Sequence, residues 1–244
     1  MNKRVSWFSA GVSSAVATKL VLQDHPDIEI LYIDIDDQHP DSLRFKDDCE
    51  KWFGKEIKIL KSKYPNVDSV CRAFRFVNGV GGARCTSTLK RRVRKEWEHI
   101  NKPTHYVWGF DASRKEKSRA ERVVQTMPEF IHIFPLIDKG ITKEVAHGIL
   151  NKAGIKRPAM YDMGYPNNNC IGCVKGGKGY WNKIRTDFPD VFQLRANMER
   201  ELGYTCIKGV YLDELDPSEG REQKIIVEDC GIFCELLTEE SSNE

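Results

Sequence analysis

Apolar and polar positions follow two different periods through the first two thirds of the chain. Short apolar runs typical of buried parallel strands cover residues 4–9, 28–35, 57–60, 105–109 and 131–136. Between these runs, apolar residues three and four positions apart predict helices from Ser13 onward and over residues 41–53, 88–98, 113–124 and 142–154. Repeated strand–helix alternation is typical of a doubly wound, mainly parallel α/β sheet of Rossmann-like architecture.

The character of the chain changes after Pro158, where glycine, asparagine, cysteine and aromatic residues become frequent. Helical spacing returns over residues 191–202. We therefore expect an α/β domain over residues 1–157 and a small cysteine-containing C-terminal extension over residues 158–238, packed on that domain. Residues 239–244 are polar, which predicts a frayed tail.

The composition is that of a folded protein, since 40% of the 244 residues are hydrophobic and 10% are aromatic. The formal net charge is only +2, so no overall basic field argues for nucleic acid. The first residues, MNKRVSWFSA, lack the apolar core of a secretory signal, and no run approaches the ~18 apolar residues of a membrane span. We therefore expect a soluble cytoplasmic protein with no membrane partner.

The segment Ser9-Ala10-Gly11-Val12-Ser13-Ser14 lies directly between the first predicted strand and the first predicted helix. A helix N-terminus presents free N–H groups and the positive end of a dipole to an anion. Small residues let the backbone approach a phosphate closely, and serine hydroxyls add donors. The segment therefore predicts a phosphate-binding loop. The alternative is an ordinary strand-to-helix turn in which a serine caps the helix.

Acidic residues follow the second predicted strand, on the edge of the sheet that carries ligands in such folds. Asp34 and Asp36 there suit a ribose hydroxyl or a Mg²⁺ ion chelated by phosphates. A solvated turn is the alternative interpretation.

Basic residues are concentrated in two predicted helices. Lys90 belongs to the run LKRRVRK, which begins four residues after Cys85 and suits a polyphosphate, a sulfate or a nucleic-acid backbone. Arg119 and Arg122 lie one turn apart and are candidates for contact with an α-phosphate. The alternatives are a charged outer helix face and surface ion pairs with neighbouring glutamates.

Eight cysteines in a reducing compartment favour metal, redox or buried thiol chemistry over a disulfide framework. Cys170 and Cys173 form a CxxC pair whose thiolates can close on one metal. A second pair, Cys230 and Cys234, can complete a four-cysteine zinc site with it. Cys230 is also a candidate thiolate nucleophile, although acidic rather than cationic residues precede it. Inert buried thiols are the remaining alternative.

Five segments, in order, resemble the phosphoadenosine phosphosulfate (PAPS) reductase and PP-loop ATP pyrophosphatase superfamily. SAGVSS resembles the SGGxDS loop, with Ala10 and Ser13 as departures, and YIDIDDQHPDSLRF resembles DTGxxHPxTxxF. GARCTSTLKR, with Cys85, is similar to the cysteine segment before a basic helix. WGFDASRKEKSRAER, which begins with Trp108 and Gly109, resembles a diverged Gly-x-Arg segment, and PAMYDMGYPNNNCIGC resembles the Tyr-x-x-Gly-Tyr…Cys-x-x-Cys stretch.

The resemblance implies an adenine nucleotide α-hydrolase-like fold that binds ATP or a related nucleotide with Mg²⁺. It implies that Lys90 contacts the substrate anion and that Gly109 belongs to the nucleotide site. It further implies a [4Fe–4S] cluster at Cys85, Cys170 and Cys173, as in adenosine phosphosulfate reductases and several tRNA-thiolating enzymes. Cys85 stands alone where the reductases carry paired cysteines, and zinc is the alternative metal.

The expected function is ATP pyrophosphatase-type adenylation of an acceptor coupled to sulfur transfer, with a nucleic acid or a sulfur carrier as the acceptor. One alternative is reduction of a sulfonucleotide, with Cys230 as the nucleophile and thioredoxin as the reductant. Another is a non-catalytic nucleotide-sensing or partner-binding protein with a structural metal. The change of the loop aspartate to Ser13 favours the reductase, whereas the retained SxGxxS frame favours ATP.

Overall fold

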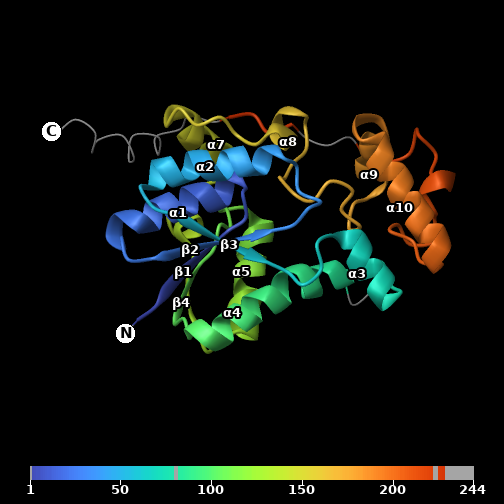
Figure 1. Cartoon of the computed structure of the whole chain (residues 1–244). Coiled ribbons are helices and arrows are strands. Elements are labelled where there is room, and N and C mark those ends of the chain that lie inside the picture. Colours follow the sequence, from blue (N-terminus) through green and yellow to red (C-terminus); the bar gives the residue numbers. More distant parts are fainter. Residues whose placement is uncertain (1, 80–81, 222–224, 229–244) are drawn as a thin grey trace.

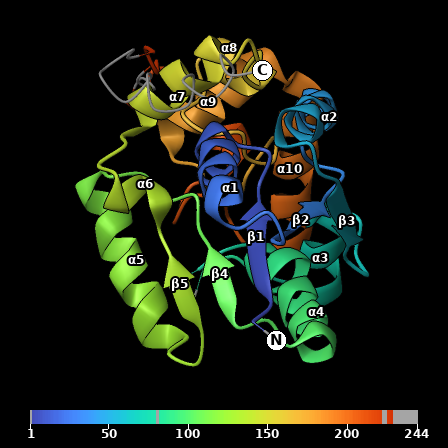
Figure 2. The same ribbon diagram turned by 90° about the vertical axis from the view of Figure 1, so that its left-hand side faces the viewer.

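The computed structural model of the chain describes residues 2–79, 82–221 and 225–228. A five-stranded parallel sheet runs in the order β3-β2-β1-β4-β5 (Figure 1 and Figure 2). Its strands are β1 (Arg4–Phe8), β2 (Glu29–Asp34), β3 (Ile57–Lys61), β4 (His105–Val107) and β5 (Ile131–Ile133). The prediction of a doubly wound parallel sheet is confirmed.

Helices follow each strand and continue after the last one. They are α1 (Val12–Asp24), α2 (Asp41–Phe53), α3 (Val67–Phe74), the π-helix η1 (Thr86–Arg92), α4 (Val93–Asn101), α5 (Arg114–Thr126), α6 (Pro135–Asp138), α7 (Lys143–Lys152), α8 (Ala159–Asp162), α9 (Lys178–Asp187), α10 (Pro189–Leu202) and the 3₁₀ turn η2 (Leu212–Glu214). Among the described residues, no helix has the length and apolar character needed to cross a membrane.

Successive residues of β1 point to opposite faces of the sheet, and each face is covered by helices. Phe8 packs into the core shared with α1, α2 and α7. Val5 packs on the other face, in a cluster with Trp97 of α4. Figure 1 shows α1, α2 and α7 on one side of the sheet and α4 and α5 on the other. Two covered faces explain why the central strands are apolar at nearly every position.

A second core lies beyond the sheet edge, where α8, α9 and α10 pack with α3. Trp181 of α9 and Met198 of α10 are fully buried there, in one cluster with Val70 and Cys71 of α3. Arg195 of α10 is also fully buried and forms an ion pair with Asp37, which follows β2. The cysteine-containing region therefore contacts the segments that follow β2 and β3. The division at residue 157 stays a prediction, and residues 239–244 lie outside the described part of the chain.

Two local expectations differ from the structure. The apolar run 131–136 was expected to be a strand throughout, but β5 ends at Ile133 and Pro135 opens the short helix α6. Proline has no N–H to donate to a sheet, and its fixed φ suits the first turn of a helix. Helix α9 was not expected, because the glycines at 176, 177 and 179 mask its apolar spacing.

Candidate functional site

The chain reverses its direction across the sheet between β1 and β4. Strands β2 and β3 lie on one side of β1, whereas β4 and β5 lie on the other. In open parallel sheets such a reversal leaves a crevice at the carboxyl ends of the two strands, and ligands bind there. The predicted phosphate loop at Ser9–Ser14 follows β1, and Gly109 follows β4. Both segments therefore meet at the ligand-binding edge.

Helix α1 begins with an N-terminus suited to an anion. Gly11 is its N-cap residue in an extended conformation and has no side chain to cap the helix, whereas the Tyr161 hydroxyl hydrogen-bonds the backbone of Val12 in the first turn. The N–H groups of the first turn have no carbonyl partner within the helix and carry partial positive charge. The turn also contains no acidic residue. The N–H groups of this turn can donate hydrogen bonds to a phosphate oxygen at the crevice.

Ser14 supports the loop from the inside. Its hydroxyl accepts hydrogen bonds from the amide and the hydroxyl of Ser9, both at 3.1 Å, and donates to the carbonyl oxygen of Gly11 at 2.8 Å. Ser14 is buried, whereas Ser9 is exposed and Ser13 is half-buried. The loop therefore has one structural serine and two serines that solvent or a ligand can reach.

Ala10 adopts a left-handed conformation, with φ of 54°, although it carries a Cβ atom. This conformation costs an L-residue about 1–2 kcal/mol. Ala10 is fully buried, and its carbonyl oxygen accepts a hydrogen bond of 2.7 Å from the side-chain amide of Asn168. The PP-loop pattern has a glycine at this position. Because glycine adopts positive φ freely, the left-handed turn at Ala10 is the one that the pattern predicts.

Gly109 lies directly against the start of α1. A Cβ atom placed on Gly109 would lie 2.5 Å from Cα and 2.7 Å from the backbone nitrogen of Ser14. Real Cβ atoms do not approach backbone so closely, so only glycine fits. The segment that follows β4 thus packs directly against the start of α1. We call this contact at Gly109 the glycine wall.

Two residues near the CxxC motif also reach the loop, and sequence reasoning missed both. The hydroxyl of Tyr161 interacts with the backbone of Val12, and burial raises its pKa to about 12. Asn168 donates to Ala10 and to the Ser42 hydroxyl, while its own buried Oδ1 has no partner among the described residues. Tyr161 is the first tyrosine of the Tyr-x-x-Gly-Tyr motif, whereas the only sequence signal for Asn168 is its place in the stretch that ends at Cys173.

The acidic residues after β2 have different surroundings. Asp34 is half-buried and lies 3.6 Å from the ammonium group of Lys61. Asp36 has an exposed side chain, and its amide donates to the carbonyl of Pro65. Asp37 accepts a hydrogen bond from the Val67 amide and pairs with Arg195, so it has a structural role. Asp34 and Asp36 keep carboxylate oxygens that a Mg²⁺ ion can use.

The basic candidates lie on exposed helix surfaces. Lys90 is exposed on the π-helix η1, directly after Cys85, and π-helical turns are frequent at functional sites. Arg119 on α5 lies 3.2 Å from Glu116, and its guanidinium lies 4.4 Å from the ring centre of Phe110, the residue after Gly109. Arg122 is exposed one turn further along α5. Arg119 therefore contacts Phe110, the residue that directly follows Gly109.

Three of the predicted metal ligands lie close enough for their charges to interact. The Cys85 thiol interacts with Cys173, and the Cys170 thiol interacts with both. Burial raises the pKa of Cys170 to about 11, and the ammonium group of Lys90 partly opposes this shift. Gly172, with φ of 68°, makes the turn inside the CxxC motif. The Tyr180 hydroxyl accepts from the Cys173 amide at 2.9 Å and donates to the Cys170 carbonyl at 3.2 Å.

A metal at these cysteines is not supported by their geometry. Within residues 2–79, 82–221 and 225–228, no group of three or more His, Cys, Asp or Glu side chains is arranged to hold a metal ion. Cys230 and Cys234 lie outside the described residues, so the four-cysteine zinc site and the Cys230 nucleophile stay predictions. Thiols are suitable donors for zinc or iron, and the [4Fe–4S] cluster at Cys85, Cys170 and Cys173 stays a prediction.

The crevice, the helix N-terminus with its glycine N-cap and the glycine wall define a Rossmann-like protein of the nucleotide-binding class. The family profile of the phosphoadenosine phosphosulfate reductase domain matches residues 3–177. The chain therefore belongs to this family, which confirms the family resemblance of its motifs and supports a nucleotide-binding enzyme.

One curated relative, from Methanocaldococcus jannaschii, carries a name that says only that it is uncharacterized. It is 23% identical over 232 residues, which cover 91% of this chain and 54% of the relative. The chain thus spans about half the length of the curated relative that it matches.

Proposed function

We propose that the chain binds Mg²⁺–ATP at the β1–α1 loop and transfers the adenylyl group to an acceptor, with release of pyrophosphate. The observation that carries this proposal is the N-terminus of α1, with a glycine N-cap and no acidic residue in its first turn, beside Gly109 in a chain of this family. A departing pyrophosphate is stabilised by preorganised N–H donors aimed at the charge that develops in the transition state. The exposed Ser9 hydroxyl adds a donor at the same edge.

Two arginines on α5 suit the negative charge of the α-phosphate. Arg119, held over Phe110, and Arg122 lie on the helix that follows the glycine wall. A guanidinium matches two phosphate oxygens at once, so these residues suit the phosphate that is attacked. The carboxylates of Asp34 and Asp36 suit Mg²⁺, whose charge neutralises the polyphosphate.

Sulfur transfer forms the second half of the proposal. The acceptor oxygen attacks the α-phosphorus, and pyrophosphate leaves. A persulfide on one of the cysteines Cys85, Cys170 or Cys173 then attacks the activated carbon with its outer sulfur, and AMP leaves with the oxygen. A second of these thiolates attacks the inner sulfur, which frees the thiolated acceptor and leaves a disulfide that an added thiol reductant restores. Burial raises the pKa of the Cys85 thiol, and the positive charges of Lys175 and Lys90 partly offset that shift.

A titration calorimeter and a product assay test this function. We expect Mg²⁺–ATP to bind, Arg119→Gln to weaken binding about tenfold, and Arg114→Gln on the same helix to leave it unchanged. With radiolabelled ATP, a persulfide donor and RNA, we expect AMP and pyrophosphate in equal amounts. If ATP bound without any turnover, nucleotide sensing would replace catalysis.

Sulfonucleotide reduction is the second candidate, because Ser13 replaces the aspartate of the ATP-type loop. In that case PAPS binds more tightly than ATP, and reduced thioredoxin releases sulfite. Cys230→Ser then abolishes sulfite release while leaving PAPS binding intact. If sulfite formed at the same rate with Cys230→Ser, that cysteine would not be the nucleophile.

A further inference from the structure

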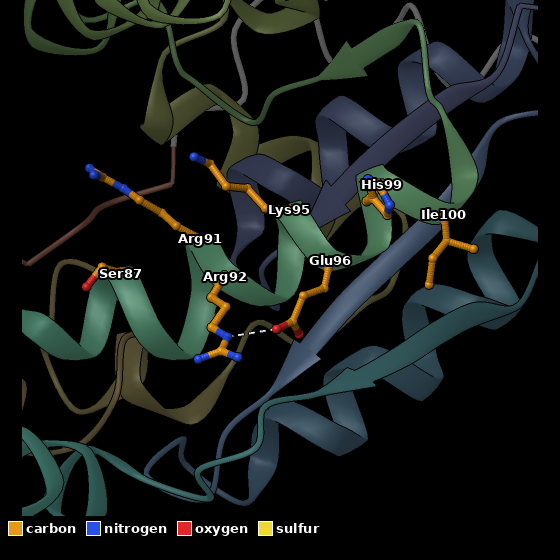
Figure 3. Close-up of a pocket in the computed structure, with 7 residues that line it drawn as sticks. All are labelled: Ser87, Arg91, Arg92, Lys95, Glu96, His99 and Ile100. Atoms are coloured by element: carbon orange, nitrogen blue, oxygen red, sulfur yellow. Dashed lines mark hydrogen bonds and ion pairs between the residues drawn. The ribbon is translucent and has the colours of Figure 1, made fainter.

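Side chains four positions apart form two parallel rows along η1 and α4. Figure 3 shows Arg91, Lys95 and His99 in one row and Arg92, Glu96 and Ile100 in the next. Residues four apart lie on the same face of a helix, so each row spans about two turns. Together they line a surface hollow of about 650 Å³.

The two rows differ in how their charges are balanced. Arg92 forms an ion pair of 2.7 Å with Glu96, which Figure 3 marks with a dashed line. Arg91 and Lys95 have no carboxylate partner within 4.0 Å among the described residues, and both are exposed. The first row therefore presents uncompensated positive charge to solvent.

A second hollow, of about 480 Å³, continues the first one toward the cysteines. Arg91 and Ser87 line both hollows, and Phe74, Phe76, Arg84 and Lys175 line the second. We call the two together the basic groove. Neither Arg84 nor Lys175 has a carboxylate partner in the described part of the chain. The groove thus combines a line of free cations with two phenylalanines.

Phe74 and Phe76 line the groove, and Tyr204 contacts Phe76. Phe74 is 37% exposed, and the Arg84 guanidinium lies 4.3 Å from its ring centre. Phe76 makes an edge contact, 5.4 Å between ring centres, with Tyr204, which is 45% exposed. Exposed rings beside cations offer stacking surfaces for bases next to binding points for phosphates.

The groove ends beside the cysteines. Cys85 lies between Arg84 and Thr86, both of which line the second hollow, and Lys175 lies two residues after Cys173. The charges of Cys85 and Lys175 interact. A polymer that follows the groove therefore passes beside Cys85, whose own side chain is buried.

We propose that the basic groove binds a single-stranded nucleic acid, with phosphates on Arg91, Lys95 and Lys175 and bases stacked on Phe76 and Tyr204. The net charge of the whole chain is only +2, so the attraction is local to this face. Bases in a duplex are already stacked, so the aromatic wall selects a single strand. That this strand is also the sulfur acceptor rests on the proposed function, whereas its binding does not.

Fluorescence anisotropy with a labelled oligonucleotide of ~12 nucleotides, in the absence of ATP, tests the groove. We expect the triple variant Arg91→Gln/Lys95→Gln/Lys175→Gln to weaken binding and to reduce the slope of log K against log salt by about 2. The matched control, Lys51→Gln/Lys139→Gln/Lys156→Gln, removes the same charge from α2 and from the segments after α6 and α7. It should keep both the affinity and the slope. Equal losses in the two triple variants would overturn the proposal.

A second variant tests the stacking wall. Phe76→Leu keeps an apolar side chain but removes the ring, and we expect about tenfold weaker binding of the single strand. Phe76→Tyr should bind as the native chain does, and unfolding midpoints verify that both variants fold. Unchanged affinity of Phe76→Leu, or equal affinity for a duplex of the same sequence, would contradict single-strand binding. Because the assay contains no ATP, its outcome is separate from that of the ATP assay.

Discussion

The side chain of Asn168 donates a hydrogen bond of 2.7 Å to the carbonyl oxygen of Ala10. This bond joins the cysteine-containing segment to the nucleotide loop, since Asn168 lies two residues before Cys170. Its second bond, of 3.0 Å, reaches the Ser42 hydroxyl at the start of α2. Asn168 is only 8% exposed, so its amide ties together three segments that are far apart in the chain.

Replacing Asn168 should weaken nucleotide binding. Asn168→Ala leaves a buried carbonyl without its donor, which costs about 1–3 kcal/mol of folding stability. Because the left-handed turn at Ala10 then loses its support, we expect ATP affinity to fall about tenfold, which is ~1.4 kcal/mol. Calorimetric titration and thermal unfolding measure the two effects.

The control for this variant is its neighbour. Asn169 is exposed and makes no side-chain hydrogen bond among the described residues, so Asn169→Ala should leave both quantities unchanged. Equal ATP affinities for the native chain and Asn168→Ala would show that the loop holds its shape without the amide.

Adding a single methyl group at Gly109 should disturb the same loop from the other side. The new Cβ would meet the Ser14 backbone at 2.5 Å, and a rigid main chain cannot yield as a flexible side chain does. We expect Gly109→Ala to destabilise the fold by about 1–3 kcal/mol and to abolish ATP binding. Gly177→Ala is the matched control, since nothing lies within 4 Å of a Cβ there. Native ATP binding by Gly109→Ala would remove the glycine wall from the site.

Ala10 offers a test of strain in the loop. Ala10→Gly removes the cost of a left-handed L-residue, about 1–2 kcal/mol, but adds about 0.5–1 kcal/mol of backbone entropy. We therefore expect its free energy of unfolding to stay within ~1 kcal/mol of the native value, with ATP binding retained. Ala10→Val places a β-branched residue at φ of 54° and should lose binding. A denaturant titration in which Ala10→Val is as stable as Ala10→Gly would contradict this account.

The sheet and its nucleotide edge were predictable because their signals are local. The apolar run ending at Phe8 and the helical spacing after Gly11 placed the loop between β1 and α1. Parallel topology then required the segments after β1 and β4 to meet, and Gly109 meets Ser14 there. The period of the apolar residues predicted the loop, whereas the strand order that brings β4 beside β1 is known from the structure, and Gly109 was expected there only from the family resemblance.

The supports of the loop were not predictable, because they depend on long-range packing. Asn168 and Tyr161 reach the loop only once α8 and the following turn are folded against α1 and α2. Ser14 has the same residue type as Ser9 and Ser13, and only the structure shows that it is the buried one. A sequence pattern marks which residues share a loop, but not which of them face inward.

His147 on α7 connects the acid stability of the fold to this loop. It is 1% exposed, its ring centre lies 4.6 Å from that of Tyr161, and neither ring nitrogen has a hydrogen-bond partner among the described residues. Burial lowers the pKa of His147 from 6.5 to about 3, and the charges of Arg157 and Lys143 act in the same direction. The folded protein therefore holds this side chain neutral.

The sign of the pH effect follows from that shift. The unfolded chain binds a proton at His147 below about pH 6.5, whereas the folded chain does not do so until about pH 3. The stability contributed by the neutral ring is thus complete above pH 6.5 and is lost as the pH falls toward 3. From this group alone we expect a loss of up to about 1 kcal/mol per pH unit in that window. Urea titrations between pH 7 and pH 4 measure the slope.

Replacing His147 should reduce the dependence of folding stability on pH. His147→Phe keeps an aromatic ring against Tyr161 and needs no proton, so we expect a smaller loss of stability on acidification. His99→Gln, on the exposed surface of α4, is the control and should keep the native slope. Because the folded chain holds His147 neutral until about pH 3, ATP affinity should change alike in the native chain and in His147→Phe between pH 7 and pH 4. Identical slopes for the native chain and His147→Phe would assign the acid sensitivity to other groups.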